Sequence, residues 1–192
     1  MHSPMLAYTD RYVQFLPSRE ELEEQKKVSF SYAPLISIVV PAYETPEIYL
    51  RELIGTVQAQ TYTNWELCLA DGSKSRQVAQ IAEEYAKTDK RIRYQKLLHN
   101  GGISENTNEG LKMASGAYIA LMDHDDLLSE NALYEMVKCL NESYLPEERK
   151  AAMIYSDEDK INGDGSVHSR PHFKPDFNLE FLRHNNYFCH FL

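Results

Sequence analysis

The sequence is poor in cysteine, and its three cysteines lie far apart among 192 residues. Cys68, Cys139 and Cys189 form neither a Cys-x-x-Cys pair nor the spacing of a zinc site, and an odd number does not suit a framework of disulfides. The pattern excludes the small disulfide-rich domains of secreted proteins. It fits a reducing compartment, so we expect a cytoplasmic protein, either free or peripheral at the inner face of the membrane.

Long apolar runs are missing as well. The apolar stretches are far shorter than the ~20 residues that span a bilayer. The N-terminus lacks a basic segment followed by an apolar one, which is the mark of a signal peptide. The sequence therefore predicts no transmembrane segment and no signal peptide.

Positive charge is scarce relative to negative charge. The chain has 20 Lys and Arg against 29 Asp and Glu, for a formal net charge of −9. Proteins that bind duplex nucleic acid usually present a basic surface, so we expect no nucleic-acid partner. An acidic protein that binds a phosphorylated ligand needs a cation between them, and a divalent metal ion is the usual one.

Apolar β-branched runs alternate with segments of helical period from Leu35 onwards. Strands are predicted over residues 35–40, 65–70, 91–98, 117–122 and 151–155. Helices are predicted after Thr45, over residues 78–85 and 101–115, and after Ser129. This alternation predicts βαβ units, and therefore an α/β fold with a mainly parallel sheet and helices on both faces.

Residues 1–31 differ from the rest and are expected to form a helical extension, with residues 32–192 as the α/β domain. Ser18 is placed to cap a helix, and Glu21 completes a capping box. The polar residues that follow suit a helix that leans on the domain or on a neighbouring protein.

Three polar segments interrupt the chain at the ends of predicted strands: residues 41–44, 71–73 and 123–126. Open parallel sheets bind ligands beyond the carboxyl ends of their strands. We therefore expect these sequence-distant segments to meet on one rim of the sheet.

The acidic turn from Asp123 to Asp126 follows six apolar residues and places the carboxylates of Asp123 and Asp125 two positions apart. Hard oxygen ligands suit Mg²⁺ or Mn²⁺, which keep some of their waters and bridge a diphosphate. The alternative is an ordinary solvated turn.

The other two rim segments and a glycine-rich loop each have a functional and a structural interpretation. Asp71 can accept a hydrogen bond from a nucleotide base or cap the next helix. Tyr43 can lie against a base or pack on the rim. The backbone N–H groups of Asn100 to Gly102, before a helix, can face an anion or form a plain turn.

Four segments, in this order, resemble family 2 glycosyltransferases of the GT-A fold. They are residues 38–44, 69–73, 100–110 and 120–126. The resemblance runs from about Leu35 to the end. Residues 155–160 and 173–176 resemble the members that build bacterial surface polysaccharides.

The resemblance implies an enzyme that transfers a sugar, with inversion, from a UDP, dTDP or GDP sugar to a saccharide or lipid-linked saccharide. Asp125 is implied as the ligand of Mn²⁺ or Mg²⁺, and Asp123 as a contact to ribose or metal. His190 is either a further diphosphate or metal contact or a partly buried histidine. The predicted nucleotide-binding residues are Pro41, Ala42, Tyr43, Glu44, Asp71, Asn100, Gly102 and Asp123.

The chain departs from the family pattern at three places. Ala70 replaces the first of two acidic residues before the Gly-Ser turn, and Thr107 stands where many members have Arg or Lys. The family's general base lies in a later acidic motif, so we expect it beyond Leu192 and expect the domain to be incomplete at its C-terminus. The late acidic cluster of Asp157, Glu158 and Asp159 suggests an acceptor side, or a charged loop before the turn at residues 162–165.

Two other functions fit parts of the sequence. The chain suits a donor-binding module that is inactive by itself, because the base and much of the acceptor site are not recognised in it. An apolar strand followed by Asp-x-Asp also opens haloacid-dehalogenase-type phosphatases, in which the first Asp is a nucleophile. Those enzymes place the motif after their first strand, whereas here it follows the fourth.

Overall fold

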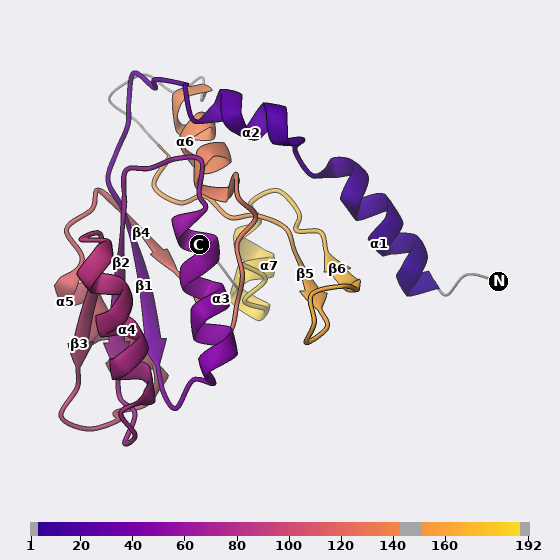
Figure 1. Ribbon diagram of the computed structural model, residues 1–192. Helices are drawn as coiled ribbons and strands as arrows, with labels where there is room; N and C mark the ends of the chain where they lie inside the picture. The colour runs from indigo at the N-terminus through magenta and orange to yellow at the C-terminus, as the bar shows by residue number, and fades with distance from the viewer. Residues whose placement is uncertain (1–3, 143–150, 189–192) are drawn as a thin grey trace.

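The computed structural model describes residues 4–142 and 151–188. One sheet contains β1 (Ile36–Ala42), β2 (Trp65–Asp71), β3 (Ile92–Lys96) and β4 (Tyr118–Leu121). The strands are parallel and lie in the order β3-β2-β1-β4 (Figure 1). The predicted parallel α/β fold is confirmed.

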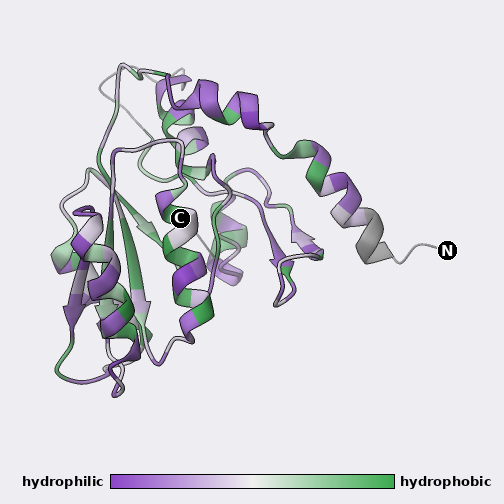
Figure 2. Cartoon of the chain, in the orientation of Figure 1, coloured by the Kyte–Doolittle hydropathy of each residue, from purple (hydrophilic) through white to green (hydrophobic). Residues whose placement is uncertain are grey.

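Helices cover both faces of this sheet. The main core packs the sheet against α3 (Glu47–Gln58), α4 (Gln77–Thr88) and α6 (Ala132–Glu142). A smaller cluster packs the other face against the end of α5 (Ile103–Met113). The two middle strands are buried along their whole length apart from one partly exposed proline, and in Figure 2 they are largely hydrophobic. Their sequences are apolar almost throughout because both faces are covered.

Strand β1 alternates between the two faces. Ile36, Ile38 and Val40 belong to the main core, whereas Val39 belongs to the cluster under α5. On that second face α5 approaches closely, because a Cβ on Gly110 would lie 2.6 Å from Val39 Cγ1. The glycine in the middle of α5 is therefore required by packing.

Two predicted element boundaries differ from the structure. Strand β1 continues through Pro41 to Ala42 instead of stopping at Pro41. The proline is tolerated because β1 pairs with β4 only over residues 36–39, while its pairing with β2 continues to Ala42. Helix α3 begins at Glu47 with Pro46 as N-cap, not with Thr45.

The strand predicted over residues 151–155 is wrong, because this segment has no regular structure and no strand partner in the described part of the chain. Instead, the Tyr118 hydroxyl donates to the Ala151 carbonyl at 2.9 Å. The next residues form an antiparallel hairpin of β5 (Glu158–Ile161) and β6 (His168–His172), followed by α7 (Leu179–His184).

The N-terminal residues form α1 (Pro4–Phe15) and α2 (Arg19–Gln25). The predicted capping box is confirmed: the Glu21 N–H donates to Ser18 Oγ at 3.2 Å, and the Ser18 N–H donates to Glu21 Oε2 at 2.7 Å. Leu22 of α2 is buried, and Thr61 Oγ1 donates to Gln25 at 3.0 Å, so α2 leans on the domain.

Helix α1 packs against the hairpin, on the side of the molecule away from β3 (Figure 1). The Thr9 hydroxyl bonds to both backbone groups of His168, at 3.0 and 3.1 Å. The Tyr12 ring stacks on the His168 ring with 4.0 Å between centroids. Within the described ranges, no helix has both the length and the apolar character needed to cross a bilayer.

Candidate functional site

The sheet brings the three polar segments to one rim. Strand β1 lies between β2 and β4, so its carboxyl end separates Asp71 from the acidic turn. The Gly72 N–H donates to the Ala42 carbonyl at 2.9 Å, and the Met122 N–H donates to the Val39 carbonyl at 3.2 Å. The topology therefore gives the predicted convergence of sequence-distant segments.

The acidic turn begins at Asp123, two residues after the last residue of β4. Asp123 is half-buried, Asp125 is exposed, and the Asp126 N–H donates to the Asp123 carbonyl at 3.3 Å. Between them, His124 buries its Nδ1 atom without a hydrogen-bond partner among the described residues. The turn follows the fourth strand in the chain, which does not match the phosphatase alternative.

The donor set of this turn fits a hard divalent cation. Mg²⁺ in proteins commonly takes one or two carboxylates and completes its shell with phosphate oxygens and water. Asp123 and Asp125 supply two such carboxylates. In residues 4–142 and 151–188, no group of three His, Cys, Asp or Glu side chains is arranged to hold a metal ion. Asp123 and Asp125 would therefore supply only part of a coordination shell, and other ligands would have to complete it.

Asp71 is completely buried at the end of β2. Its Oδ1 atom accepts the Ser73 N–H at 2.7 Å, and Oδ2 accepts the Tyr94 hydroxyl at 2.8 Å and Lys96 Nζ at 3.1 Å. Burial and the hydrogen bond to Asp71 raise the pKa of Tyr94, so the phenol remains a donor. A carboxylate has about four acceptor positions, and protein groups occupy three of them here.

The loop after β1 is tied to the loop after β2. The Glu44 N–H donates to Ser73 Oγ at 2.8 Å. Glu44 Oε1 accepts the backbone N–H groups of Lys74 at 2.6 Å and Ser75 at 3.1 Å. Hydrogen bonds from Ser75 and Lys74 lower the pKa of Glu44. Its carboxylate is thus directed at the neighbouring backbone, whereas Tyr43 beside it is 40% exposed.

The remaining predicted residues of the β1 end are covered to different degrees. Ala42 is completely buried, and Pro41 is half-buried. A ligand at this rim therefore meets the ring of Tyr43 more readily than Ala42.

The glycine-rich loop before α5 is organised by two asparagines. Asn100 Oδ1 accepts the Gly102 N–H at 3.0 Å and Asn106 Nδ2 at 2.9 Å, and Asn106 Oδ1 accepts the Gly101 N–H at 3.2 Å. The N–H groups of Gly101 and Gly102, expected to face an anion, therefore bond to asparagine side chains. Gly102 has a φ of 85°, a conformation that favours glycine.

This loop also touches the end of β2. A Cβ on Gly72 would lie 2.8 Å from Asn106 Nδ2 and 3.2 Å from the Asn100 Cα atom. Gly72 thus lets the loop close against the strand end, which brings Asn100 to the same rim as Asp71.

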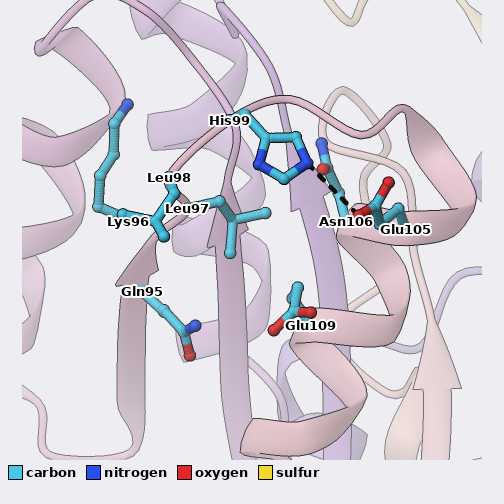
Figure 3. Close-up of a pocket in the computed structure, with 8 residues that line it drawn as sticks. All are labelled: Gln95, Lys96, Leu97, Leu98, His99, Glu105, Asn106 and Glu109. Atoms are coloured by element: carbon cyan, nitrogen blue, oxygen red, sulfur yellow. Dashed lines mark ion pairs between the residues drawn. The ribbon is translucent and has the colours of Figure 1, made fainter.

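A cavity of about 200 Å³ lies next to this loop, between the residues after β3 and helix α5 (Figure 3). His99 Nε2 and Glu105 Oε1, 3.4 Å apart, bridge one side of it. In Figure 3 the Lys96 side chain extends away from the other lining residues, which leaves its ammonium group free to reach Asp71.

The carboxylates of residues 157–159 all have hydrogen-bond or ion-pair partners in the described structure. Asp157 Oδ1 accepts the Lys174 N–H at 2.7 Å, and Glu158 Oε2 lies 3.0 Å from Lys174 Nζ, a side chain that is 1% exposed. Asp159 accepts the Tyr8 hydroxyl at 3.0 Å and lies 2.9 Å from His168 Nδ1. Glu158 and Asp159 belong to β5, so the charged-loop interpretation is wrong for them.

His190 lies outside the described residues. Conversely, the sequence interpretation missed Tyr94 and Lys96, and it gave no role to Ser73 or Asn106, although these two lie in the segments 71–73 and 100–110 that it selected. Asn106 left a further signal, because it is a polar residue on the helix face that also carries the buried Gly110 and Met113.

Comparisons with known proteins agree on one family. The model of glycosyl transferase family 2 matches residues 37–145. An uncharacterised protein y4gI of Sinorhizobium fredii is 44% identical over 158 residues, which cover 82% of this chain and 17% of that protein. The O-antigen biosynthesis protein RfbC of Myxococcus xanthus is 33% identical over 92% of this chain and 13% of its own length. The chain thus spans less than a fifth of these curated relatives.

Solved structures give the same fold. TarS of S. aureus, a structure that has also been solved with UDP and with UDP-GlcNAc, superposes with a TM-score of 0.52 at 27% identity over 56% of this chain and 32% of its own. A mannosyltransferase from Pyrobaculum calidifontis, in complex with GDP-Man and Mn²⁺, superposes with a TM-score of 0.51 at 19% identity over 70% of this chain and 39% of its own. These neighbours have the GT-A fold.

Proposed function

Because the chain belongs to glycosyl transferase family 2, we propose that its protein transfers a sugar from a nucleotide-sugar donor to a saccharide acceptor in the synthesis of a cell-surface polysaccharide. The observation that carries the proposal is the convergence of Tyr43, Asp71 and the acidic turn at the carboxyl ends of neighbouring parallel strands. The relationship to an O-antigen biosynthesis protein supports the polysaccharide product.

The nucleotide binds along this rim in our proposal. The exposed ring of Tyr43 stacks on the base. Asp71 has one acceptor position left for a base N–H, but its carboxylate is completely buried, so the nucleotide would have to displace the side chains that cover it. TarS has been solved with UDP and the archaeal mannosyltransferase with GDP-Man, which supports a nucleoside-diphosphate sugar without choosing the base.

Asp125 and Asp123 are the residues that would hold Mn²⁺ or Mg²⁺. A cation bound there stabilises the negative charge that develops on the departing nucleoside diphosphate. The Mn²⁺ in the mannosyltransferase complex supports a divalent cation in the reaction, without identifying its ligands in this chain. Asp125 is exposed and can turn toward the diphosphate, whereas Asp123 is half-buried beside β4 and can also reach the ribose.

The transfer is inverting in our proposal: a carboxylate removes the proton from an acceptor hydroxyl, whose oxygen attacks the anomeric carbon as the nucleoside diphosphate departs. The described carboxylates of β5 do not suit this role, because Glu158 pairs with Lys174 and Asp159 with Tyr8 and His168. The family that the chain resembles carries its base in a later acidic motif, and on that ground we assign the base to a residue outside the described part of the chain. We place the reaction in the cytoplasm.

Isothermal titration calorimetry tests the donor site. The 192-residue chain with Mn²⁺ is titrated with UDP, GDP and dTDP, next to the Asp125→Ala variant and the control Asp164→Ala in the hairpin turn. We expect one nucleotide to bind, Asp125→Ala to abolish the binding heat, and Asp164→Ala to leave it unchanged. Binding that is equal in all three proteins would contradict the assignment.

A second candidate is a donor-binding module without transferase activity of its own, favoured by the small share of the relatives that this chain spans. Incubation with the preferred nucleotide sugar distinguishes the two. Release of nucleoside diphosphate in the presence of saccharide acceptors shows transfer, whereas tight binding without release shows a module.

A further inference from the structure

The backbone after β2 is held from two sides by charged side chains of other elements. The β2 loop, defined as residues 71–75, begins with the last residue of β2 and precedes α4. Helix α4 has Arg76 at its N-cap and no side-chain cap. The loop therefore gets its support from elsewhere in the chain.

Glu44 supports the loop from the β1 side. Its carboxylate accepts the N–H groups of Lys74 and Ser75, and its own N–H donates to Ser73 Oγ. Glu44 has a φ of 48°, a left-handed conformation that is unfavourable for a residue with a side chain. Three hydrogen bonds to the β2 loop accompany this conformation.

Lys96 supports the loop from the β3 side. Its ammonium group donates to the Asp71 carboxylate at 3.1 Å, to the Ser73 carbonyl, and to the Ser75 carbonyl at 3.4 Å. Glu44 thus binds N–H groups of the loop, and Lys96 binds its carbonyls and its buried carboxylate. The anionic Glu44 accepts hydrogen bonds from donors of the loop, and the cationic Lys96 donates hydrogen bonds to its acceptors.

We propose that Glu44 and Lys96 are positioning residues that fix the β2 loop, and with it Asp71, in the conformation that accepts the nucleotide. The inference rests on the proposed function for its ligand. Because the loop is held before any ligand arrives, nucleotide binding does not have to order it. Glu44 therefore acts through the loop, and its carboxylate need not touch the ribose.

Two measurements on the 192-residue chain test the proposal. The first is hydrogen exchange of the Lys74 and Ser75 amides in the nucleotide-free protein. The second is the dissociation constant of the nucleotide that the wild-type chain prefers, with Mn²⁺ present. The variants are Glu44→Ala and Lys96→Met, with Glu44→Gln and Lys96→Arg as conservative partners. The controls are Glu47→Ala, three residues from Glu44, and Lys90→Met, two residues after the end of α4.

We expect faster exchange at both amides and about three- to tenfold weaker nucleotide binding in Glu44→Ala and Lys96→Met. Glu44→Gln keeps an acceptor oxygen and Lys96→Arg keeps the charge, so both should recover part of the affinity. The two control variants should match the wild type. Thermal unfolding of each variant identifies any that fails to fold. If the Glu44 variant fails, the Lys96 variant tests the proposal, and the reverse holds if the Lys96 variant fails.

Faster exchange with unchanged nucleotide affinity would overturn the proposal, because the loop would be held for stability alone. Unchanged exchange in folded variants would overturn it as well. A wild-type chain that binds none of the nucleotides would instead refute the proposed function, while the exchange data would still show whether Glu44 and Lys96 hold the loop.

Discussion

Single buried polar residues decide much of the local structure, and Glu66 of β2 is the clearest case. Its carboxylate accepts the Ser37 hydroxyl at 2.6 Å, the Ser115 N–H at 2.5 Å and the Arg93 guanidinium at 2.9 Å. Glu66 thereby ties β1, β3 and the segment before β4 to one strand. Burial alone would raise the pKa of Glu66, but the hydrogen bonds outweigh it and lower the pKa to about 2.

This shift predicts a loss of stability in acid. A carboxyl whose folded pKa lies below its unfolded pKa stabilises the fold above the unfolded value, near pH 4.5, and loses that contribution as pH falls toward 2. Urea unfolding between pH 6 and about pH 2.5 should show a declining free energy of unfolding. Glu66→Gln should be less stable at pH 6 and decline less steeply. Asp89 has a pKa lowered to about 2 by Arg91, so part of the slope should remain.

Alanine substitutions at two helical glycines should change the free energy of unfolding in opposite directions. Gly110→Ala places a methyl group 2.6 Å from Val39 Cγ1, so it should lower the free energy of unfolding by about 1–3 kcal/mol. Gly55 in α3 is exposed, and a Cβ there meets nothing within 4 Å, so Gly55→Ala should raise stability by about 0.5–1 kcal/mol. Urea unfolding of both variants checks the contrast. Equal effects would refute the close approach of α5 to the sheet.

At the scale of elements, the sheet and its helices were predictable because their apolar residues repeat with the period of each element. The capping box at Ser18 was predictable because all its members lie within four residues. The hairpin of β5 and β6 was not predicted, since its short strands are polar and partly exposed. The bonds of Asp71 to Tyr94 and Lys96 join residues more than twenty positions apart, which no local pattern reveals.

The packing of α1 against the hairpin predicts a coupling between them. Tyr12→Ala removes the ring that stacks on His168, so the amides of residues 158–172 should exchange faster with solvent. Phe15→Ala is the control, because the Phe15 side chain is 85% exposed on the same helix. Hydrogen exchange resolved by peptide measures both. Equal exchange in the two variants would show that α1 does not stabilise the hairpin.

For the whole molecule, the net charge of −9 bears on donor binding. An acidic chain repels a diphosphate unless a cation lies between them. We expect excess EDTA to weaken binding of the preferred nucleoside diphosphate strongly, and binding of the corresponding nucleoside much less. Calorimetry with both ligands, with and without chelator, separates the two effects. Equal loss for both ligands would point to a metal that supports the fold instead of the phosphates.

The proline within β1 has a consequence for the shape of the rim. The Val39 carbonyl faces β4. Backbone groups two residues apart along a strand face the same side, so the backbone nitrogen of Pro41 also faces β4. Proline has no N–H, and this position therefore cannot donate a hydrogen bond to β4. The next rung of that ladder therefore cannot form, and the chain leaves the sheet at Met122. Pro41 of β1 thus sets the residue at which the hydrogen bonding of β4 ends, and the acidic turn with its carboxylates begins there.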